Sequence, residues 1–230
     1  MVSIAQKRFY YWFTTFQISI LSSHLNYLQR TKLHQEFLDY AYHNIGIRVI
    51  ATDFDLTMMT RHSGGYINPL SASGSVFLLS LSQDFNILAS VAQKMNIPIS
   101  VVTFSDKKLI PLEFKDVCIS GSDLISLSLK KSKASFKIDS TFCYYPKLWQ
   151  KPQDYLQIGL INPMPSGKSF HLKKVCETYN IKPNQIIFID DDVRNCRIAL
   201  KEGYIAMSIK GNSGYSIDSI DISFYETMLD

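Results

Sequence analysis

Two aspartates set two positions apart are the residues of this sequence best suited to chemistry. Asp53 and Asp55 come directly after an apolar run, residues 47–52, that reads I-R-V-I-A-T. Because side chains alternate between the two faces of a strand, both carboxylates point the same way where the chain leaves the strand. Two converging carboxylates repel each other unless a cation or a shared proton compensates them. The pair therefore predicts that a metal ion binds at this strand end.

A second apolar run also ends in acidic residues. Residues 186–189, I-I-F-I, are followed by three consecutive aspartates, of which the first two are Asp190 and Asp191. Carboxylate oxygens suit Mg²⁺, which takes one or two carboxylates, several waters and a substrate phosphate. Two acidic strand ends therefore predict Mg²⁺ as the cofactor.

Two further polar residues complete the candidate set. Thr103 ends the apolar run 99–103, and Lys168 stands just before an expected helix. A hydroxyl group and a compact ammonium charge both bind phosphate oxygens. Together with the two acidic strand ends, these residues predict a site for phosphoryl transfer.

Apolar runs and amphipathic segments alternate along most of the chain. We expect strands over residues 47–52, 99–103, 117–120, 186–189 and 205–209, and helices over residues 82–94, 121–131, 169–179 and 195–202. Continuous apolar strands separated by helices are typical of a doubly wound parallel sheet that is covered on both faces. In this α/β fold class, sites form at the carboxyl ends of strands, where the candidate acids lie.

The predicted organisation has a helical extension before the core. Residues 1–45 read as two helical pieces packed on the core, the second with Thr31 as its N-cap and Asn-Ile-Gly at 44–46 as its stop. The core is expected over residues 46–230. It carries an insertion at about 122–165. Residues 135–159 of this range are rich in aromatic side chains, neither helical nor strand periodicity dominates there, and some strand is expected.

Composition argues against several classes of protein. The apolar run at 9–21 is interrupted by polar residues and falls short of the ~20 apolar residues of a membrane span, so we expect a packed helix, with secretion or membrane association left open by the run. The net charge of +4 with scattered lysines gives no reason to expect nucleic-acid binding. Four cysteines without zinc-ligand spacing read as free thiols, and we expect a cytoplasmic location.

Four short motifs in order resemble those of one known family. D-F-D-L-T at 53–57 matches the D-x-D-x-T signature of the haloacid dehalogenase-like superfamily of phosphatases, V-V-T-F-S at 101–105 matches its second motif, Lys168 its third, and I-I-F-I-D-D at 186–191 its fourth. The resemblance covers about residues 47–209 and is poor between 122 and 165. It is greatest to the magnesium-dependent phosphatase branch with a small or absent cap, and it implies a Rossmann-like core.

The resemblance implies a two-step mechanism. Asp53 would attack phosphorus and form an aspartyl-phosphate, while Asp55 would protonate the leaving group and then activate water. Mg²⁺ would be held by the Asp53 carboxylate, the backbone carbonyl of Asp55 and one of Asp190 or Asp191. The third aspartate of that row, Asp192, is expected to be a helix N-cap instead of a ligand.

The remaining site residues follow from the same resemblance. Thr103 and Lys168 would bind the oxygens of the transferred phosphoryl group, and Asn195 would support the loop that carries the acidic row. His62 and His171 could reach a substrate, but we expect each to be a loop or helix-surface histidine.

Two other functions are open to this sequence. A domain of the same fold without activity could bind a protein partner through its N-terminal helices and aromatic insertion. Residues 165–169, P-S-G-K-S, followed by I-I-F-I-D-D, also resemble the phosphate-binding loop and acidic strand of a kinase. That pattern requires a glycine where Asn162 stands, and it leaves Asp53 and Asp55 unexplained, so it ranks below the phosphatase.

The lengths between motifs bear on the substrate. The interval from Asp55 to Thr103 has room for a helix and for a polar, glycine-bearing loop or small hairpin at 61–69, but not for a separate cap domain. The site is therefore expected to be open. We expect it to accept a phosphorylated partner, either a phosphoprotein carrying phosphotyrosine or phosphoserine or a small phosphoester.

Overall fold

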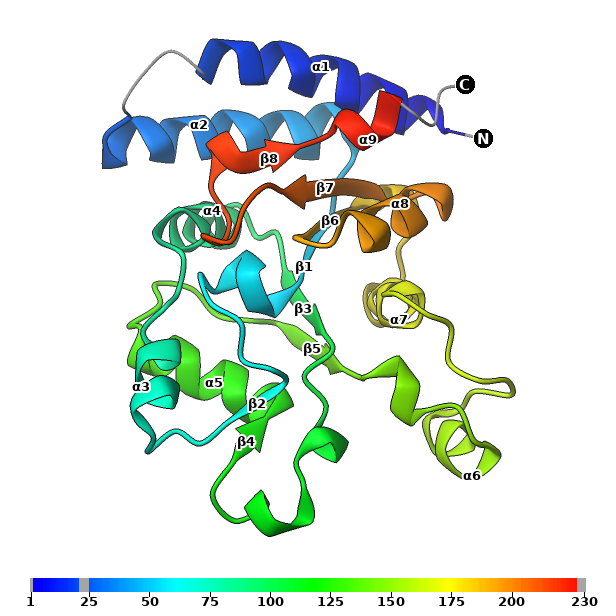
Figure 1. Cartoon of the computed structure of the whole chain (residues 1–230). Coiled ribbons are helices and arrows are strands. Elements are labelled where there is room, and N and C mark those ends of the chain that lie inside the picture. The colour runs from blue at the N-terminus through cyan, green and yellow to red at the C-terminus, as the bar shows by residue number, and fades with distance from the viewer. Residues whose placement is uncertain (1, 21–24, 227–230) are drawn as a thin grey trace.

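A mostly parallel sheet forms the centre of the molecule (Figure 1). The computed structural model describes residues 2–20 and 25–226. The sheet has six strands in the order β5-β3-β1-β6-β7-β8. In that order their bounds are Ser140–Cys143, Ile99–Thr103, Val49–Thr52, Ile186–Asp190, Ile205–Ile209 and Ile220–Asp221. Every neighbouring pair is parallel except β7 and β8.

The parallel register sets the ends of three strands side by side. Thr52, the last residue of β1, lies opposite Val101 of β3 and Ile189 of β6. All three strands are buried along their whole length, as expected for strands that are covered on both faces. Residues that follow β1, β3 and β6 therefore leave the sheet at one shared edge.

Helices cover the two faces of the sheet (Figure 1). On one face lie α4 and α5, and on the other lie α7 and α8; their bounds are Gln83–Lys94, Gly121–Lys131, Ser169–Tyr179 and Val193–Lys201. This arrangement confirms the expected α/β class with a doubly wound, Rossmann-like sheet. Asp192 caps α8 as predicted, because it accepts the Arg194 N–H at 2.8 Å. Ser82 caps α4 by accepting the Phe85 N–H at 3.2 Å.

One helix was not expected. α3, Ala72–Leu78, has the sequence A-S-G-S-V-F-L, in which glycine and serine are weak helix formers. It begins because the Ser71 side chain accepts the Gly74 N–H at 3.0 Å. Gly74 cannot be replaced without a shift, since a Cβ there would lie 1.9 Å from the backbone oxygen of Asn68.

The aromatic region after α5 contains both a sheet strand and a surface segment. Although the range 122–165 was expected as an insertion, β5 within it is the edge strand of the sheet, parallel to β3. Its half-buried sequence S-T-F-C has no continuous apolar run, so its place in the sheet is not evident from sequence. The chain after β5, which includes α6 (Pro152–Tyr155), packs around Trp149, Met164 and Phe170.

Short strands account for the other differences. The strand expected at 117–120 does not join the central sheet; it is β4, Ile119–Ser120, and it pairs antiparallel with β2, Tyr66–Ile67. β2 lies in residues 61–69, which we call the flap. β7 is not the last strand, because the antiparallel β8 and the short helix α9, Ser223–Glu226, follow it. These elements are too short to give a periodic pattern.

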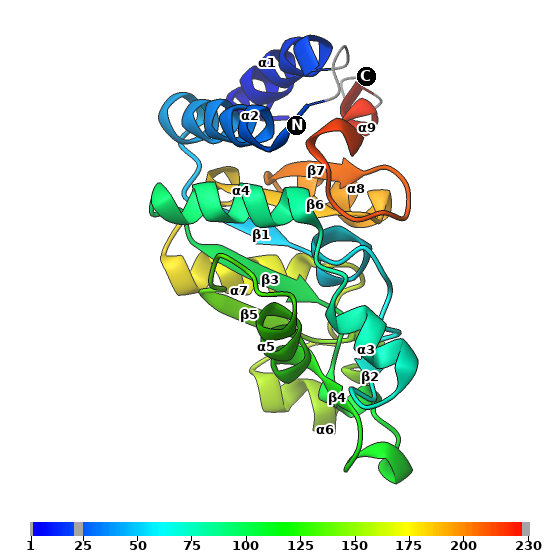
Figure 2. The ribbon, with the colours of Figure 1, turned by 90° about the vertical axis from the view of Figure 1, so that its left-hand side faces the viewer.

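The N-terminal extension is a helix pair above the β7–β8 edge of the sheet (Figure 2). α1, Ile4–Ile20, is a packed helix as predicted, and α2 spans Tyr27–Tyr40. Thr31 as the N-cap of α2 is wrong. Asn26 caps the helix by accepting the Gln29 N–H at 3.0 Å, while the Gln29 side chain accepts the Asn26 N–H at 2.9 Å. This reciprocal pair satisfies two end groups and so moves the helix start to an earlier residue.

The predicted stop of this extension is confirmed. The chain leaves the helical path at Gly46, whose φ of 90° is readily adopted only by glycine. Residues 1 and 21–24, which belong to the predicted extension, lie outside the described residues. Within the described ranges, no helix combines the length and apolar character needed to cross a membrane.

Two buried polar side chains of α1 hold the extension on the core. The Tyr10 hydroxyl donates to the Ala206 carbonyl at 2.7 Å and accepts the Ala206 N–H at 2.9 Å. The Gln6 amide donates to the carbonyls of Leu200 and Tyr204 at 3.0 and 2.8 Å. α1 therefore completes the hydrogen bonds of a strand whose outer side β8 covers only in part.

Replacing Tyr10 by phenylalanine should lower the free energy of unfolding by about 1–3 kcal/mol, because both backbone groups of Ala206 would lose a buried partner. Denaturant titration measures this loss. The matched control is Tyr11→Phe, since Tyr11 is 82% exposed and its hydroxyl lies outside the core. Equal stability of the Tyr10→Phe protein and the control would show that the hydroxyl does not hold α1.

Candidate active site

The shared edge of the sheet brings together residues from three strand ends. Asp53 continues the parallel ladder one residue beyond β1, since its N–H donates to the Ile189 carbonyl at 2.8 Å. Thr103 ends β3 and Asp190 ends β6, on either side of it. All three residues are at least nine-tenths buried. The structure therefore brings these three predicted site residues to one edge of the sheet.

Lys168 reaches into this cluster from the start of α7. It is 1% exposed, and its Nζ donates to Oδ1 of Asp53 at 2.5 Å and to the Val102 carbonyl at 2.8 Å. The same ammonium group lies 3.9 Å from the centre of the Phe104 ring, close enough for a cation–π contact. The chain before Lys168 comes from α6 and a turn, not from a strand, which is unlike a kinase phosphate-binding loop.

Asp55 is turned back toward Asp53 by a distorted segment. The turn is closed by the Met59 N–H, which donates to the Phe54 carbonyl at 2.8 Å, and Leu56 inside it has a φ of 55°. A non-glycine residue in this left-handed region costs about 1 kcal/mol. The strained turn places Asp55 on the wall of the same cavity as Asp53.

The two oxygens of Asp55 have different surroundings. Oδ2 accepts a hydrogen bond from the Ser63 hydroxyl at 2.7 Å. Oδ1 is buried, and no group among the described residues bonds it. Burial, followed by the charge of Asp53, raises the pKa of Asp55 to about 6, although the Ser63 bond opposes this. Asp55 therefore has a carboxyl group that can both give and take a proton near neutral pH.

Asp190 is held by the residue that was expected to support its loop. The Asn195 amide donates to both carboxylate oxygens of Asp190, at 3.2 and 3.1 Å, and the Asp192 N–H donates to one of them at 2.7 Å. Burial, followed by the charge of Asp53, raises the pKa of Asp190 well above its usual range. The bonds fix the direction of a carboxylate whose negative charge is costly at this place.

Asp191 lies nearer to the surface and has a different partner. The Thr57 hydroxyl donates to its Oδ1 at 3.3 Å. Burial, followed again by the charge of Asp53, raises the pKa of Asp191 to about 6. Asp190 and Asp191 thus differ in burial and in partners, and the ladder position at the end of β6 belongs to Asp190.

Four aspartates share this site with one buried lysine, and this balance fits a divalent cation. Burial, followed by the charge of Asp53, raises the pKa values of Asp55, Asp190 and Asp191, so negative charge on these carboxyls is costly without a cation. Among the described residues, no three acidic, histidine or cysteine side chains form a ready-made metal cage. Mg²⁺ does not need one, because it binds through one or two carboxylates together with waters and phosphate oxygens.

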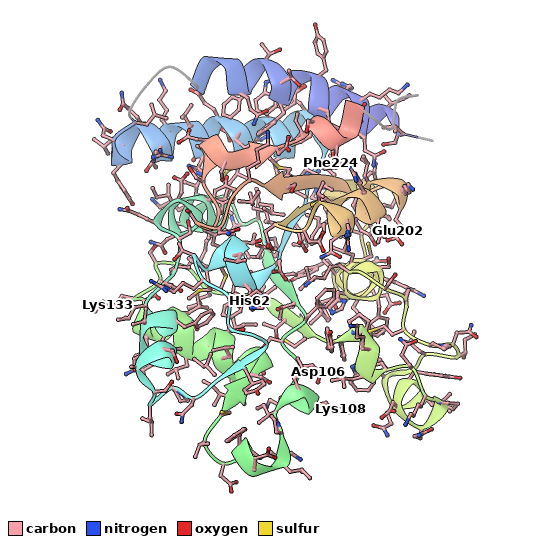
Figure 3. All side chains as sticks on the ribbon, in the orientation of Figure 1. His62, Asp106, Lys108, Lys133, Glu202 and Phe224 are labelled. Carbon is pink, nitrogen blue, oxygen red and sulfur yellow. The ribbon has the colours of Figure 1, made fainter. Side chains whose placement is uncertain are left out.

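The site opens into a cavity of about 320 Å³. The wall of this cavity is formed by two of the aspartates, by flap residues and by the loop after β3. The lining residues are Asp53, Asp55, His62, Gly64, Gly65, Thr103, Phe104, Ser105, Leu109 and Tyr145. His62 lies between the end of β1 and the β2–β4 pair (Figure 3). Its Nδ1 accepts the Gly64 N–H at 2.8 Å, so in the neutral ring the hydrogen lies on Nε2.

Two residues that shape this cavity were not singled out from the sequence. Asp106 Oδ2 accepts the Tyr145 N–H at 3.1 Å and the Trp149 indole N–H at 2.7 Å, and so it fixes the aromatic segment beside the site. Ser105 donates to the Gly65 carbonyl at 2.7 Å and joins the flap to the loop after β3. Ser105 is the last residue of the second motif and Asp106 follows it directly, so that motif was the signal for both.

His171 was expected to be a surface histidine, and this prediction is wrong. It is fully buried, its Nε2 lies 2.9 Å from the Tyr144 carbonyl, and its ring meets that of Phe104 at 5.7 Å. Burial, helped by the charge of Lys168, lowers the pKa of His171 to about 3. A neutral His171 therefore lies behind the site, and it does not touch the cavity.

No protein-family model matches this chain, and no curated protein gives a significant match. Among solved structures, an uncharacterised protein of Corynebacterium glutamicum is 11% identical with a TM-score of 0.38, covering 72% of this chain and 87% of its own. The N-terminal part of a Bacteroides fragilis protein, which contains a phosphatase domain and was solved with Mg, is 13% identical with a TM-score of 0.41, and the match covers 86% of this chain and 45% of that chain. The L-2-haloacid dehalogenase of Xanthobacter autotrophicus is 7% identical with a TM-score of 0.36, and the match covers 71% of this chain and 77% of that chain. Similarity this low carries no information on activity.

His171 should make the protein less stable as the pH falls. The unfolded chain takes up a proton near the ordinary pKa of 6.5, whereas the folded protein does not do so until about 3. Between these values the unfolded state binds more protons, so stability is lost as the pH falls. Lowering the pH from 7.5 to 5.5 should cost the wild type about 1.4 kcal/mol relative to His171→Gln, which can keep the bond to Tyr144. Denaturant titrations at both pH values measure the difference, and a wild type and variant that change in parallel would contradict it.

Proposed function

We propose that this protein is a Mg²⁺-dependent phosphomonoesterase of the haloacid dehalogenase-like superfamily, and that it works through an aspartyl-phosphate on Asp53. One observation carries the proposal. Lys168, 115 residues away along the chain, bonds Asp53 inside a buried site whose wall also contains Thr103 and Asp55. These four residues belong to the first three motifs. The three motifs are far apart in the sequence, and the fold brings them together.

Asp53 is the proposed nucleophile. It is placed by the ladder bond to β6, and its Oδ1 is held by direct contact with the ammonium group of Lys168. As one of its carboxylate oxygens bonds to phosphorus, the bond from phosphorus to the leaving oxygen breaks. The hydroxyl of Thr103 and the ammonium group of Lys168 would bind oxygens of the transferred group.

Asp55 is the proposed acid and base. With a pKa of about 6 it can hold a proton, give that proton to the leaving oxygen, and then take one from the water that attacks the aspartyl-phosphate. The attack releases phosphate and restores the carboxylate of Asp53. Oδ1 of Asp55, which no group among the described residues bonds, is the atom proposed for this transfer.

Mg²⁺ would be held by the Asp53 carboxylate, the Asp55 carbonyl and Asp190, and when bound it would offset the charge of the phosphate. Asp190 is preferred over Asp191 as the ligand because it ends β6 beside Asp53 and Asn195 directs both of its oxygens. The bond from Thr57 would keep Asp191 in a supporting place.

The proposed substrates are phosphorylated proteins, with phosphotyrosine or phosphoserine, and small phosphoesters. The cavity supports both because no cap domain covers it among the described residues. Only the flap, the loop after β3 and Tyr145 border it. A small, partly apolar cavity open at the surface accommodates a phosphorylated side chain without unfolding of the substrate around it.

Asp53→Asn should abolish hydrolysis, because the amide cannot attack phosphorus. With Mg²⁺ and p-nitrophenyl phosphate, the rate should fall by at least about a thousandfold. The control is Asp192→Asn, since asparagine caps a helix as well as aspartate does and α8 should remain intact. Substantial turnover by Asp53→Asn would exclude an aspartyl-phosphate at this residue.

Removal of divalent cations should stop the reaction, and Mg²⁺ should restore it. Asp190→Asn should raise the Mg²⁺ concentration needed for half-maximal rate by about tenfold or more, because a carboxylate ligand is lost. Asp192→Asn, a neutral replacement in the same acidic row, should keep the wild-type Mg²⁺ dependence. The measurement is a Mg²⁺ titration of the phosphatase rate after treatment with chelator, and full activity in chelator would contradict the proposed cofactor.

A further inference from the structure

A serine of the flap contacts the proposed acid. The Ser63 hydroxyl donates to Oδ2 of Asp55 at 2.7 Å, eight residues away along the chain, and its oxygen accepts the Gly65 N–H at 3.0 Å. We propose that Ser63 is a positioning residue, which fixes the Asp55 carboxyl so that Oδ1 carries the proton toward the leaving group. This inference rests on the proposed function of the site.

The direction of the Ser63 bond decides which oxygen of Asp55 is protonated. The Gly65 N–H occupies the serine oxygen as donor, so the serine hydroxyl hydrogen is directed to Asp55. Oδ2 then acts as an acceptor, and we place the hydrogen of the protonated carboxyl on Oδ1, since Oδ2 already holds the hydrogen bond from Ser63. Oδ1 is buried and bonded by no other group among the described residues. As the bond from phosphorus to the leaving oxygen breaks, this hydrogen passes to the leaving oxygen, and Asp55 becomes a carboxylate.

His62 is the competing candidate for this task, and its contacts do not suit it. Its Nδ1 lies 3.5 Å from Oδ2 of Asp55. The same Nδ1 accepts the Gly64 N–H at 2.8 Å, so in the neutral ring it has no hydrogen to donate. The His62 side chain is also 62% exposed to solvent. Ser63 is therefore the group that orients Asp55.

The flap segment that carries Ser63 is itself fastened. Ser105, which is buried, donates to the Gly65 carbonyl at 2.7 Å and accepts the Gly121 N–H at 2.8 Å. Gly65 has a φ of 93°, and a Cβ there would come within 2.7 Å of the Leu109 side chain. A series of hydrogen bonds thus links α5 to Ser105, Gly65 and Ser63, and it fixes the position of the flap relative to Asp55.

The leaving group provides a readout that a structural role would not affect. Departure of an alkoxide requires a proton from Asp55, whereas a nitrophenolate is stable and departs with little help. Ser63→Ala should therefore lower kcat/KM for phosphoserine, an alkyl phosphate, by about tenfold or more, and for p-nitrophenyl phosphate by no more than about threefold. kcat/KM is the correct measure because it reports the steps up to departure of the leaving group.

Two further variants complete the experiment. Ser63→Thr keeps the hydroxyl and should restore most of the alkyl-to-aryl ratio of kcat/KM. Ser73→Ala is the matched control, since Ser73 is an exposed serine of α3. The ratio is independent of the fraction of protein that folds, because that fraction affects both substrates equally.

The outcomes separate this inference from the proposed function. A lowered ratio in Ser63→Ala alone supports the positioning role. An unchanged ratio overturns it, even where the overall rate falls, while the aspartyl-phosphate mechanism stands as long as Asp53→Asn is inactive. Activity in Asp53→Asn would instead remove the proposed function, whatever the behaviour of Ser63.

Discussion

The buried ion pair between Lys168 and Asp53 is the interaction on which the rest of the site depends. Taking two charges out of water costs several kcal/mol per ion, and breaking such a pair by removing one partner costs about 3–5 kcal/mol. Here the cost is offset by further contacts of the lysine with the Val102 carbonyl and the Phe104 ring. The pair joins the start of α7 to the end of β1 and so fastens this helix to the carboxyl edge of the sheet.

This single lysine does not balance the acids around it. Burial, followed by the charge of Asp53, raises the pKa values of Asp190 and Asp191. A structure that served only for stability would gain from replacing such carboxylates by neutral residues of the same shape. The site instead directs them by specific bonds, as with Asn195 on Asp190. Such an excess of oriented negative charge suits the binding of a divalent cation.

Much of the fold could be predicted because it is encoded in local patterns. The strands at 99–103 and 205–209 and the helix at 169–179 have the predicted bounds, since each is an uninterrupted apolar or amphipathic run between turn residues. β5 could not be predicted as part of the sheet, because an edge strand that is half-buried has no need of an apolar run. The burial of His171 depends on contacts with Tyr144 and Phe104, which are distant in sequence and lie beside it only in the folded chain.

The residues of the candidate site also divide into those that the sequence selects and those that it does not. Asp53, Thr103 and Asp190 stand at the ends of buried strands, so parallel pairing alone brings them together, and the sequence is sufficient to select them. Ser63 and Ser105 are common residues in loops, and they acquire meaning only from bonds across the flap. Because a loop is held by a few such bonds, its residues can change without disturbing the sheet. The direction of the Asp55 carboxyl, the proposed acid, therefore depends on the flap, the part of the site that the fold itself determines least.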